Sequence, residues 1–109
     1  MIHKKSLNRV VLVGRAGKDP EVRATKDGVL VVCFSLATNE IRAKKEHTEW
    51  HNIVAWGKVA EFVEEYIKKG QLICIEGSIY TRKWTDKKGV IHSIAEIFAN
   101  SAVPLEWKK

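Results

Sequence analysis

The sequence lacks closely spaced cysteines. The two cysteines that it does contain, Cys33 and Cys74, lie far apart and outside any C-x-x-C pair. This spacing argues against both a disulfide framework and a zinc cluster, so we expect each cysteine to pack as a small apolar side chain within a strand. The four histidines are scattered without a ligand spacing such as H-E-x-x-H. We therefore predict no bound metal and no cofactor.

Long hydrophobic runs are also missing. The longest apolar stretches, such as residues 29–34, are far shorter than the ~20 residues that a membrane-spanning helix requires. The apolar run near the N-terminus is short, is interrupted by Arg15, and lacks a small-residue cleavage site. The sequence therefore predicts no transmembrane helix and a non-secreted, cytoplasmic protein.

Acidic side chains are the minority among the charged residues. The chain has 19 Lys plus Arg against 13 Asp plus Glu, which gives a net charge of +6 over 109 residues. A basic balance of this kind favours polyanionic partners, either nucleic acid or an anionic surface, without choosing between them. The length suits a single domain, and we assign residues 1–109 to one domain.

The apolar stretches that are present are short, rich in valine and isoleucine, and separated by turn residues, which is typical of a β-rich domain. We predict strands at residues 7–15, 29–38 and 48–56, with turns at 18–20 and 26–28. A helix then follows, because its apolar side chains recur at helical spacing and Gly70 ends it. This stripe comprises Val59, Phe62, Val63, Tyr66 and Ile67.

Two further strands, at residues 71–85 and 90–105, follow the helix and are joined by a turn in "TDKKG". Three strands, a helix and two strands form the pattern of a five-stranded Greek-key barrel with its helix between strands 3 and 4. The predicted fold class is therefore all-β, an OB-fold. Residues 39–47 show no sustained periodicity, and we expect a mobile basic loop there.

Alternation along the strands predicts which side chains face the core and which face outward. In the strand predicted at residues 29–38, one side carries Leu30, Val32, Phe34 and Leu36, and we expect it to be the core face. In the predicted third strand, Trp50 and Trp56 share one side with Asn52 and Val54. The next strand has Ile73, Ile75 and Ile79 on the expected core face, and the opposite parity places Tyr80, Arg82 and Trp84 away from the core.

Outward indoles among positive charges suit an unpaired nucleic acid strand. Every base offers a π-face, and a base stacked on an aromatic ring contributes about 1–3 kcal/mol with little dependence on sequence. The alternative is ordinary packing, because tryptophan is more often a core or subunit contact than a ligand platform. Trp56 is the tryptophan for which ordinary packing is the strongest alternative, because it adjoins the start of the helix. We expect Trp107 to pack on the surface or on another subunit.

Six motifs occur in order along nearly the whole chain, namely "LNRVVLVGRAGKDPEVR", "FSLATNE", "TEWHNIVAWGK", "EYIKKG", "IEGSIYTRKWTD" and "EIFANSAVPL". With these motifs the sequence resembles the bacterial single-stranded DNA-binding proteins. The resemblance implies an OB-fold homotetramer, nucleoid-associated in the cytoplasm, that protects unpaired DNA without sequence preference during replication, recombination and repair. It implies no catalytic activity.

The same resemblance assigns site residues. It implies base stacking by Trp50, Trp56 and Trp84, where Trp56 replaces the phenylalanine usual in the family. It implies phosphate contacts by Arg9, Lys58, Lys69, Arg82 and Lys83. Charge alone adds Arg15, Arg42, Lys44, Lys45 and Lys87 to the expected DNA-binding set. Tyr66 resembles a tyrosine near the DNA path, although its helical spacing predicts a core position, and His51 resembles a histidine near a subunit contact.

The sequence departs from the family pattern at three places. A tryptophan that many members carry is missing near Ile41, so we expect weaker or purely ionic binding there. Asn52 stands where a basic residue is common. The glycine-rich linker and acidic tip do not follow "PLEWKK", so partners recruited through that tail are not expected. The chain is then either a truncated binding core or a naturally tailless member.

Two other classes of function remain open. A primosome-type adaptor is also tailless and OB-folded, and it would act as a dimer, while RNA chaperoning is a variant of the same groove. The enzyme hypothesis rests on Glu46, Glu49 and His51, which have no partner nucleophile, phosphate-binding loop or metal spacing to complete a mechanism. We therefore predict a protein that is not an enzyme.

Overall fold

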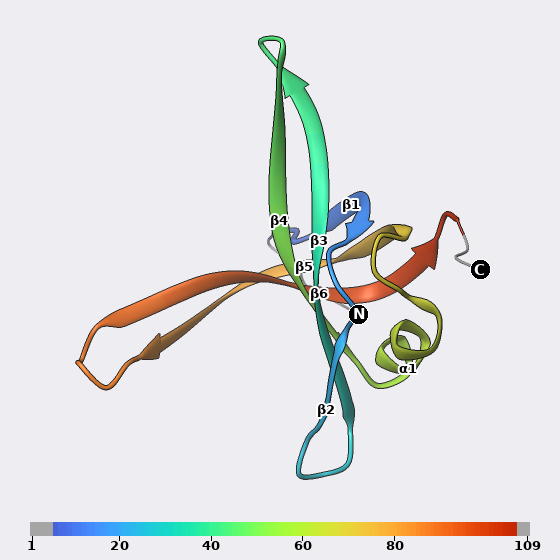
Figure 1. Cartoon of the computed structure of the whole chain (residues 1–109). Coiled ribbons are helices and arrows are strands. Elements are labelled where there is room, and N and C mark those ends of the chain that lie inside the picture. Colours follow the sequence, from blue (N-terminus) through green and yellow to red (C-terminus); the bar gives the residue numbers. More distant parts are fainter. Residues whose placement is uncertain (1–5, 107–109) are drawn as a thin grey trace.

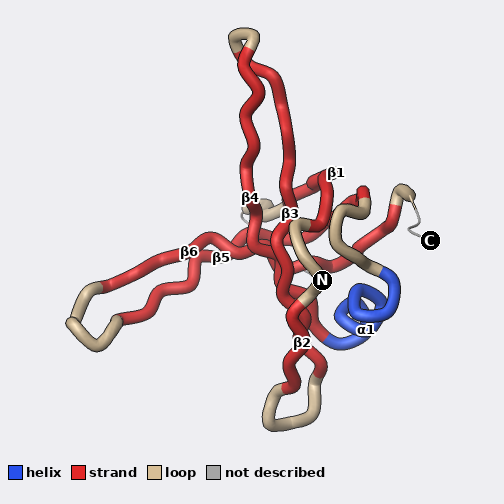
Figure 2. The backbone as a smooth tube through the Cα atoms, viewed as in Figure 1, coloured by secondary structure: helices blue, strands red, loops and turns tan. Residues whose placement is uncertain are grey.

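The computed structural model describes residues 6–106 of the chain, so Trp107 lies outside the described residues. The elements run β1 (Val10–Ala16), β2 (Glu21–Ala24), β3 (Leu30–Arg42), β4 (Lys45–Trp56), α1 (Gly57–Tyr66), β5 (Leu72–Thr85) and β6 (Ile91–Pro104). Strands dominate the tube view, and α1 lies beside them (Figure 2). Within residues 6–106, no helix has the length and apolarity needed to cross a membrane.

Five of the strands close into a barrel. They are ordered β1-β5-β6-β4-β3, and β1 pairs with β3 to close the ring. The β4–β6 pair is parallel, whereas the other pairs are antiparallel. This arrangement confirms the predicted all-β OB-fold class. The short strand β2 was not predicted, and with it counted the helix lies between β4 and β5.

Two glycines permit close approaches between strands. A Cβ at Gly14 would overlap the carbonyl oxygen of Ala37, at the point where β1 meets β3 and closes the barrel. A Cβ at Gly77 would overlap the carbonyl oxygen of Phe98, beside the register shift between β5 and β6. Because only glycine lacks the Cβ, these two positions allow the backbones to pack at these distances.

The barrel interior is filled by the alternate side chains of its strands. Val32, Phe34 and Leu36 of β3 are buried, as their parity predicts, and Ile73 and Ile75 of β5 are fully enclosed. Burying a side chain of this size contributes about 1.5–3 kcal/mol. Helix α1 packs against the same core through Ala60, Val63 and the adjoining Ile67. The amphipathic stripe therefore places the helix over the core.

The segment at residues 39–47 is not a loop, and that expectation was wrong. Strands β3 and β4 stay paired from Val31–Trp56 to Arg42–Lys45, leaving only Ala43 and Lys44 as the turn. Both turn residues have positive φ, 50° and 65°, which is the backbone of a tight two-residue hairpin turn. The Asn-Gly or Asp-Gly signal of such turns is absent, so the sequence did not reveal the hairpin. It extends away from the barrel at the top of Figure 1.

Two predicted core positions are exposed. Ile79 retains 46% of its surface in solvent, because β5 and β6 extend beyond the barrel as a hairpin and solvent reaches both faces. Tyr66 is also exposed, and its ring lies 4.9 Å from that of Phe62 in the last turn of α1. Strand alternation assigned Ile79 to the core, and helical spacing assigned Tyr66 to it. Neither pattern contains information on where the core ends.

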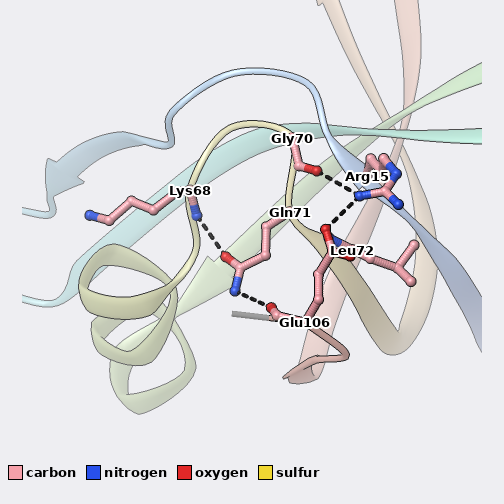
Figure 3. Close-up of polar contacts among 6 residues, drawn as sticks. All are labelled: Arg15, Lys68, Gly70, Gln71, Leu72 and Glu106. Carbon is pink, nitrogen blue, oxygen red and sulfur yellow. Dashed lines mark hydrogen bonds and ion pairs between the residues drawn. The ribbon is translucent and has the colours of Figure 1, made fainter. Parts of the chain in front are cut away.

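The chain after β6 is tied to the turn between α1 and β5 (Figure 3). Gln71 is buried, its Oε1 accepts from the Lys68 N–H at 2.9 Å, and its Nε2 donates to the Glu106 carbonyl oxygen at 2.7 Å. Arg15 donates to the carbonyl oxygen of Gly70 at 2.9 Å and to Oε1 of Glu106 at 2.6 Å. A side chain from β1 and one from the residue before β5 thus fix Glu106, the last described residue.

Candidate nucleic-acid interface

Three tryptophans project outward from the barrel. The exposed fractions are 58% for Trp50, 45% for Trp56 and 42% for Trp84. Trp50 and Trp56 lie on β4, and Trp84 lies near the tip of the β5–β6 hairpin. A fully buried indole is unavailable for stacking, so exposure of all three satisfies the first requirement of the predicted site. Their contacts with DNA remain a prediction.

Trp50 lies on β4, and its ring contacts Gly17, the residue that follows β1. Trp50 is paired with Ala37 of β3. A Cβ built at Gly17 would come within 2.5 Å of the Trp50 ring, so the indole rests directly against the Gly17 backbone. One edge of the ring is therefore supported by main chain, and more than half of its surface faces solvent.

Trp56 borders a groove on the outer face of the sheet. This central groove is formed by β2, β3, β4, β5 and β6, and its two hollows share Arg23, Cys33, Val54, Arg82 and Glu96. The hollow beside Trp56 has a volume of about 440 Å³ and is also lined by Phe98. The ring centroids of Trp56 and Phe98 are 6.3 Å apart at an interplanar angle of 42°. Trp56 therefore packs against an aromatic neighbour and also faces solvent. Both the predicted exposure and the alternative of ordinary packing hold in part for this residue.

Trp84 contacts an arginine and a histidine on the β5–β6 hairpin. The guanidinium carbon of Arg82 lies 4.9 Å from the centre of the Trp84 ring. The His92 ring stacks on it at a centroid distance of 5.2 Å and an interplanar angle of 20°. Arg82 also forms an ion pair with Glu96, with Nε and Oε1 separated by 3.1 Å. The hairpin thus presents the Trp84 indole beside the Arg82 guanidinium, which its ion pair with Glu96 orients.

Asp86 organises the tip of this hairpin. One carboxylate oxygen, Oδ2, lies 2.7 Å from Nε2 of His92, and the other, Oδ1, accepts from the backbone N–H groups of Lys88 and Val90. The hydrogen bond with His92, followed by those from the backbone, holds the pKa of Asp86 below its ordinary value of 3.8. The charged carboxylate therefore stabilises the turn that positions His92 against Trp84.

Some predicted cations lie beside the tryptophans or at the hairpin tips. Arg82 touches Trp84, whereas Lys83 lies on the opposite face of the same strand. Lys44 and Lys45 lie at the tip of the β3–β4 hairpin with Arg42, and Lys87 lies in the turn of the β5–β6 hairpin. The two hairpins therefore carry positive charge to their ends.

Other predicted cations lie away from the central groove. Arg9 is ion-paired with Glu76, and Arg15 holds the C-terminal segment through Gly70 and Glu106. Lys58 lies in the first turn of α1, and the backbone N–H of Lys69 donates to Oδ1 of Asp19 at 3.0 Å. The structure brings none of these four to the central groove. Their phosphate contacts remain predictions, and Arg15 has a structural role that its charge did not reveal.

The sequence assigned no binding role to Tyr80, Phe98 or Arg23. Phe98 enters the groove because β4 and β6 pair in parallel, with Val54 opposite Phe98. Arg23 reaches it through the unpredicted strand β2. Tyr80 has the parity of Trp84, which was the one local signal available, and its ring lies 4.8 Å from that of Phe98. The other two positions depend on pairings between distant segments.

His51 and the two cysteines lie within the strands of the sheet. The Oγ1 of Thr38 and the Nε2 of His51 are 2.8 Å apart, which gives this half-buried histidine a structural partner. Among the described residues, no three His, Cys, Asp or Glu side chains are grouped so that they could hold a metal ion. Cys33 and Cys74 are free and half-buried within β3 and β5.

Comparison with known proteins agrees with this geometry. A solved structure described as Plasmodium falciparum SSB complex with ssDNA is similar to this chain, with a TM-score of 0.87 and 33% sequence identity. The match covers 96% of this chain and 100% of that chain. The model of the single-strand binding protein family matches residues 7–105. The chain therefore belongs to the single-strand binding protein family.

Proposed function

We propose that this protein binds single-stranded DNA without sequence preference, and that bases stack on Trp50, Trp56 and Trp84 while lysines and arginines hold the phosphates. The observation that carries the proposal is the outward exposure of all three indoles, with Arg82 already stacked on one of them. The family to which the chain belongs is a DNA-binding family, and the similar solved structure is described as a complex with ssDNA.

The geometry favours an unpaired strand over a duplex. In duplex DNA the faces of the bases are hidden within the stack, so an exposed indole could reach only backbone or groove edges. In a single strand each face is open, and stacking tolerates any base. The net charge of +6 adds attraction to phosphates that is likewise independent of sequence.

Tryptophan fluorescence tests the binding and its electrostatic component together. We expect oligo(dT) to quench the emission and the affinity to decrease as salt increases, with log K falling by about 0.7 per phosphate neutralised for each tenfold rise in salt concentration. Trp84→Ala should weaken binding without lowering the melting temperature, because Trp84 lies on the hairpin outside the barrel. Binding that does not respond to salt, or no binding at all, would count against the proposal.

We also propose that the protein assembles as a homotetramer. Exposed apolar side chains support this, because Val13 and Val103 are exposed and lie in one row with the half-buried Cys74 across β1, β5 and β6, and Val11 is exposed nearby. An apolar strip of this kind is typical of an interaction surface. Light scattering measures the mass directly. A tetramer agrees with a DNA-coating protein, whereas a dimer would favour the adaptor function instead.

The cellular role proposed here follows from binding. A single domain spanning residues 1–109 would coat unpaired DNA in the cytoplasm, associated with the nucleoid, during replication, recombination and repair. It would act without catalysis, since it protects the strand by occupying it. Incubating a labelled oligonucleotide with the protein and Mg²⁺ or Mn²⁺ tests this point, because cleavage would contradict a purely binding role.

A further inference from the structure

We infer that Tyr80 and Phe98 form an additional base-stacking subsite that links Trp56 to Trp84 across the central groove. The inference rests on the proposed function, because it extends the path of the same single strand. It assigns a binding role to two aromatic residues, one on β5 and one on β6, that neither the motifs nor the charge pattern identified.

The rings of these residues lie in a continuous row. The Phe98 ring is 6.3 Å from that of Trp56 on one side and 4.8 Å from that of Tyr80 on the other, as measured between centroids. The strand order explains the row, because β6 lies between β4 and β5 in the sheet. Phe98 is paired with Val54 of β4 and with Ser78 of β5, so Trp56 and Tyr80 each lie two residues from its partner, on the same face.

The exposure of Tyr80 is unexplained by folding alone. Its side chain retains 52% of its surface in solvent, a larger fraction than that of Trp56 or Trp84. A ring that served only to pack on Phe98 would gain most by covering its second face, since the stabilisation grows with the apolar area removed from water. The exposed surface of the Tyr80 ring is instead available to a base, and the Phe98 ring packs against Tyr80 at an interplanar angle of 51°.

The surroundings of the row suit a nucleotide. Arg23 and Arg82 line the same 440 Å³ hollow as Trp56 and Phe98, so positive charge lies beside the rings. The acidic side chain in this hollow, Glu96, is largely covered and is paired with Arg82. The volume lies within the range of about 300–1,000 Å³ that ligand pockets occupy.

The spacing shows what the subsite would add. Tyr80 and Trp84 have the same parity on β5 and lie about 13 Å apart, at ~3.3 Å per residue. Arg82 lies between them, on the same face. Without Tyr80 and Phe98, the bound DNA would meet no aromatic ring between Trp56 and Trp84. With them, the row offers aromatic support from the groove to the hairpin tip.

Affinity for two oligonucleotides distinguishes stacking from general damage. We expect Tyr80→Ala to weaken binding to oligo(dT) by at least about fivefold, the equivalent of the lower stacking energy of ~1 kcal/mol, with an unchanged salt slope. Tyr80→Phe should bind as the wild type does. An abasic phosphodiester of equal length has no bases to stack, so Tyr80→Ala and wild type should bind it equally.

The matched control is Ile79→Ala, which truncates the neighbouring residue of β5 on the opposite face, where exposure is similar. It should bind oligo(dT) as the wild type does. Equal affinity of Tyr80→Ala and wild type for oligo(dT) would overturn the subsite, and so would an equal loss in Ile79→Ala. If the wild type bound neither oligonucleotide, the proposed function itself would fail, which is a separate and recognisable outcome.

A measurement on the unchanged protein covers the case in which Tyr80→Ala does not fold. An oligonucleotide carrying 5-iododeoxyuridine forms photocrosslinks to aromatic rings stacked on that base, and the crosslinked peptides are identified by mass spectrometry. Crosslinks at Tyr80 or Phe98 support the subsite. Crosslinks confined to Trp50, Trp56 and Trp84 would overturn it.

Discussion

Arg82 lies over the ring of Trp84, with its guanidinium carbon 4.9 Å from the ring centre, while its Nε remains 3.1 Å from Oε1 of Glu96. The two residues are separated by one position on β5 and share a face, so the contact follows from strand geometry. Glu96 orients the guanidinium, and the indole covers one of its faces. The pair thus places a positive charge against an exposed indole, which are the two features that the proposed phosphate contact and stacking platform require.

Two substitutions of Arg82 should separate the contribution of its charge to DNA affinity from that of its contact with Trp84. Arg82→Gln removes one positive charge from the groove, so the slope of log K against log salt should become shallower by about 0.7. Arg82→Lys keeps that charge but loses the planar group that lies on Trp84, so the slope should stay and the affinity should fall moderately. Salt titrations of both variants with oligo(dT) provide the measurement. An unchanged slope in Arg82→Gln would show that this guanidinium meets no phosphate.

Gly17→Ala should displace Trp50. The added Cβ would come within 2.5 Å of the indole, and of the Ser35 side chain, so the ring has to move. We expect altered Trp50 emission and a loss of oligo(dT) affinity of several-fold, since the platform leaves its position against the backbone. Trp50→Ala combined with Gly17→Ala is the control, because the glycine substitution should have no further effect on affinity once the indole is gone.

The tip of the β5–β6 hairpin should loosen in acid. The folded protein lowers the pKa of Asp86, so the stabilisation is complete above the ordinary value of 3.8 and is lost as the pH falls through the lower folded value. Amide exchange at Val90, whose N–H donates to Asp86, reports this loss directly. In Asp86→Asn the amide side chain does not titrate, so that step should disappear. A step that persists in the variant would assign the effect to another group.

Gln71 should be important for stability rather than for binding. Gln71→Ala leaves the Lys68 N–H and the Glu106 carbonyl oxygen without their partner, which should cost about 2 kcal/mol and lower the melting temperature by roughly 10 °C. Gln71→Glu retains the acceptor for Lys68 but buries a carboxylate against the Glu106 carbonyl oxygen, so its loss should be at least as large. Because Gln71 lies outside the central groove, affinity for oligo(dT) should be unchanged where the variant is folded.

The sequence correctly predicted the inward and outward faces of the strands wherever these depend on a local pattern. Alternation placed Val32 and Leu36 inside and the three tryptophans outside, and Gly28, with φ +84, lies at the predicted turn. It failed where an element passes the end of the barrel, as at Ile79. It also failed at Ala43 and Lys44, because a tight turn without glycine or asparagine carries no compositional signal.

The sequence by itself determined the OB-fold pattern, the family and the outward direction of Trp50, Trp56 and Trp84, because side-chain parity along one strand is a local property. Only the tertiary structure decided that Phe98 lies between Trp56 and Tyr80, and that Arg15 binds Glu106 rather than standing free. These relations depend on the register between strands and on contacts between residues far apart in the chain. No local pattern encodes either, since each is selected by how the whole barrel packs.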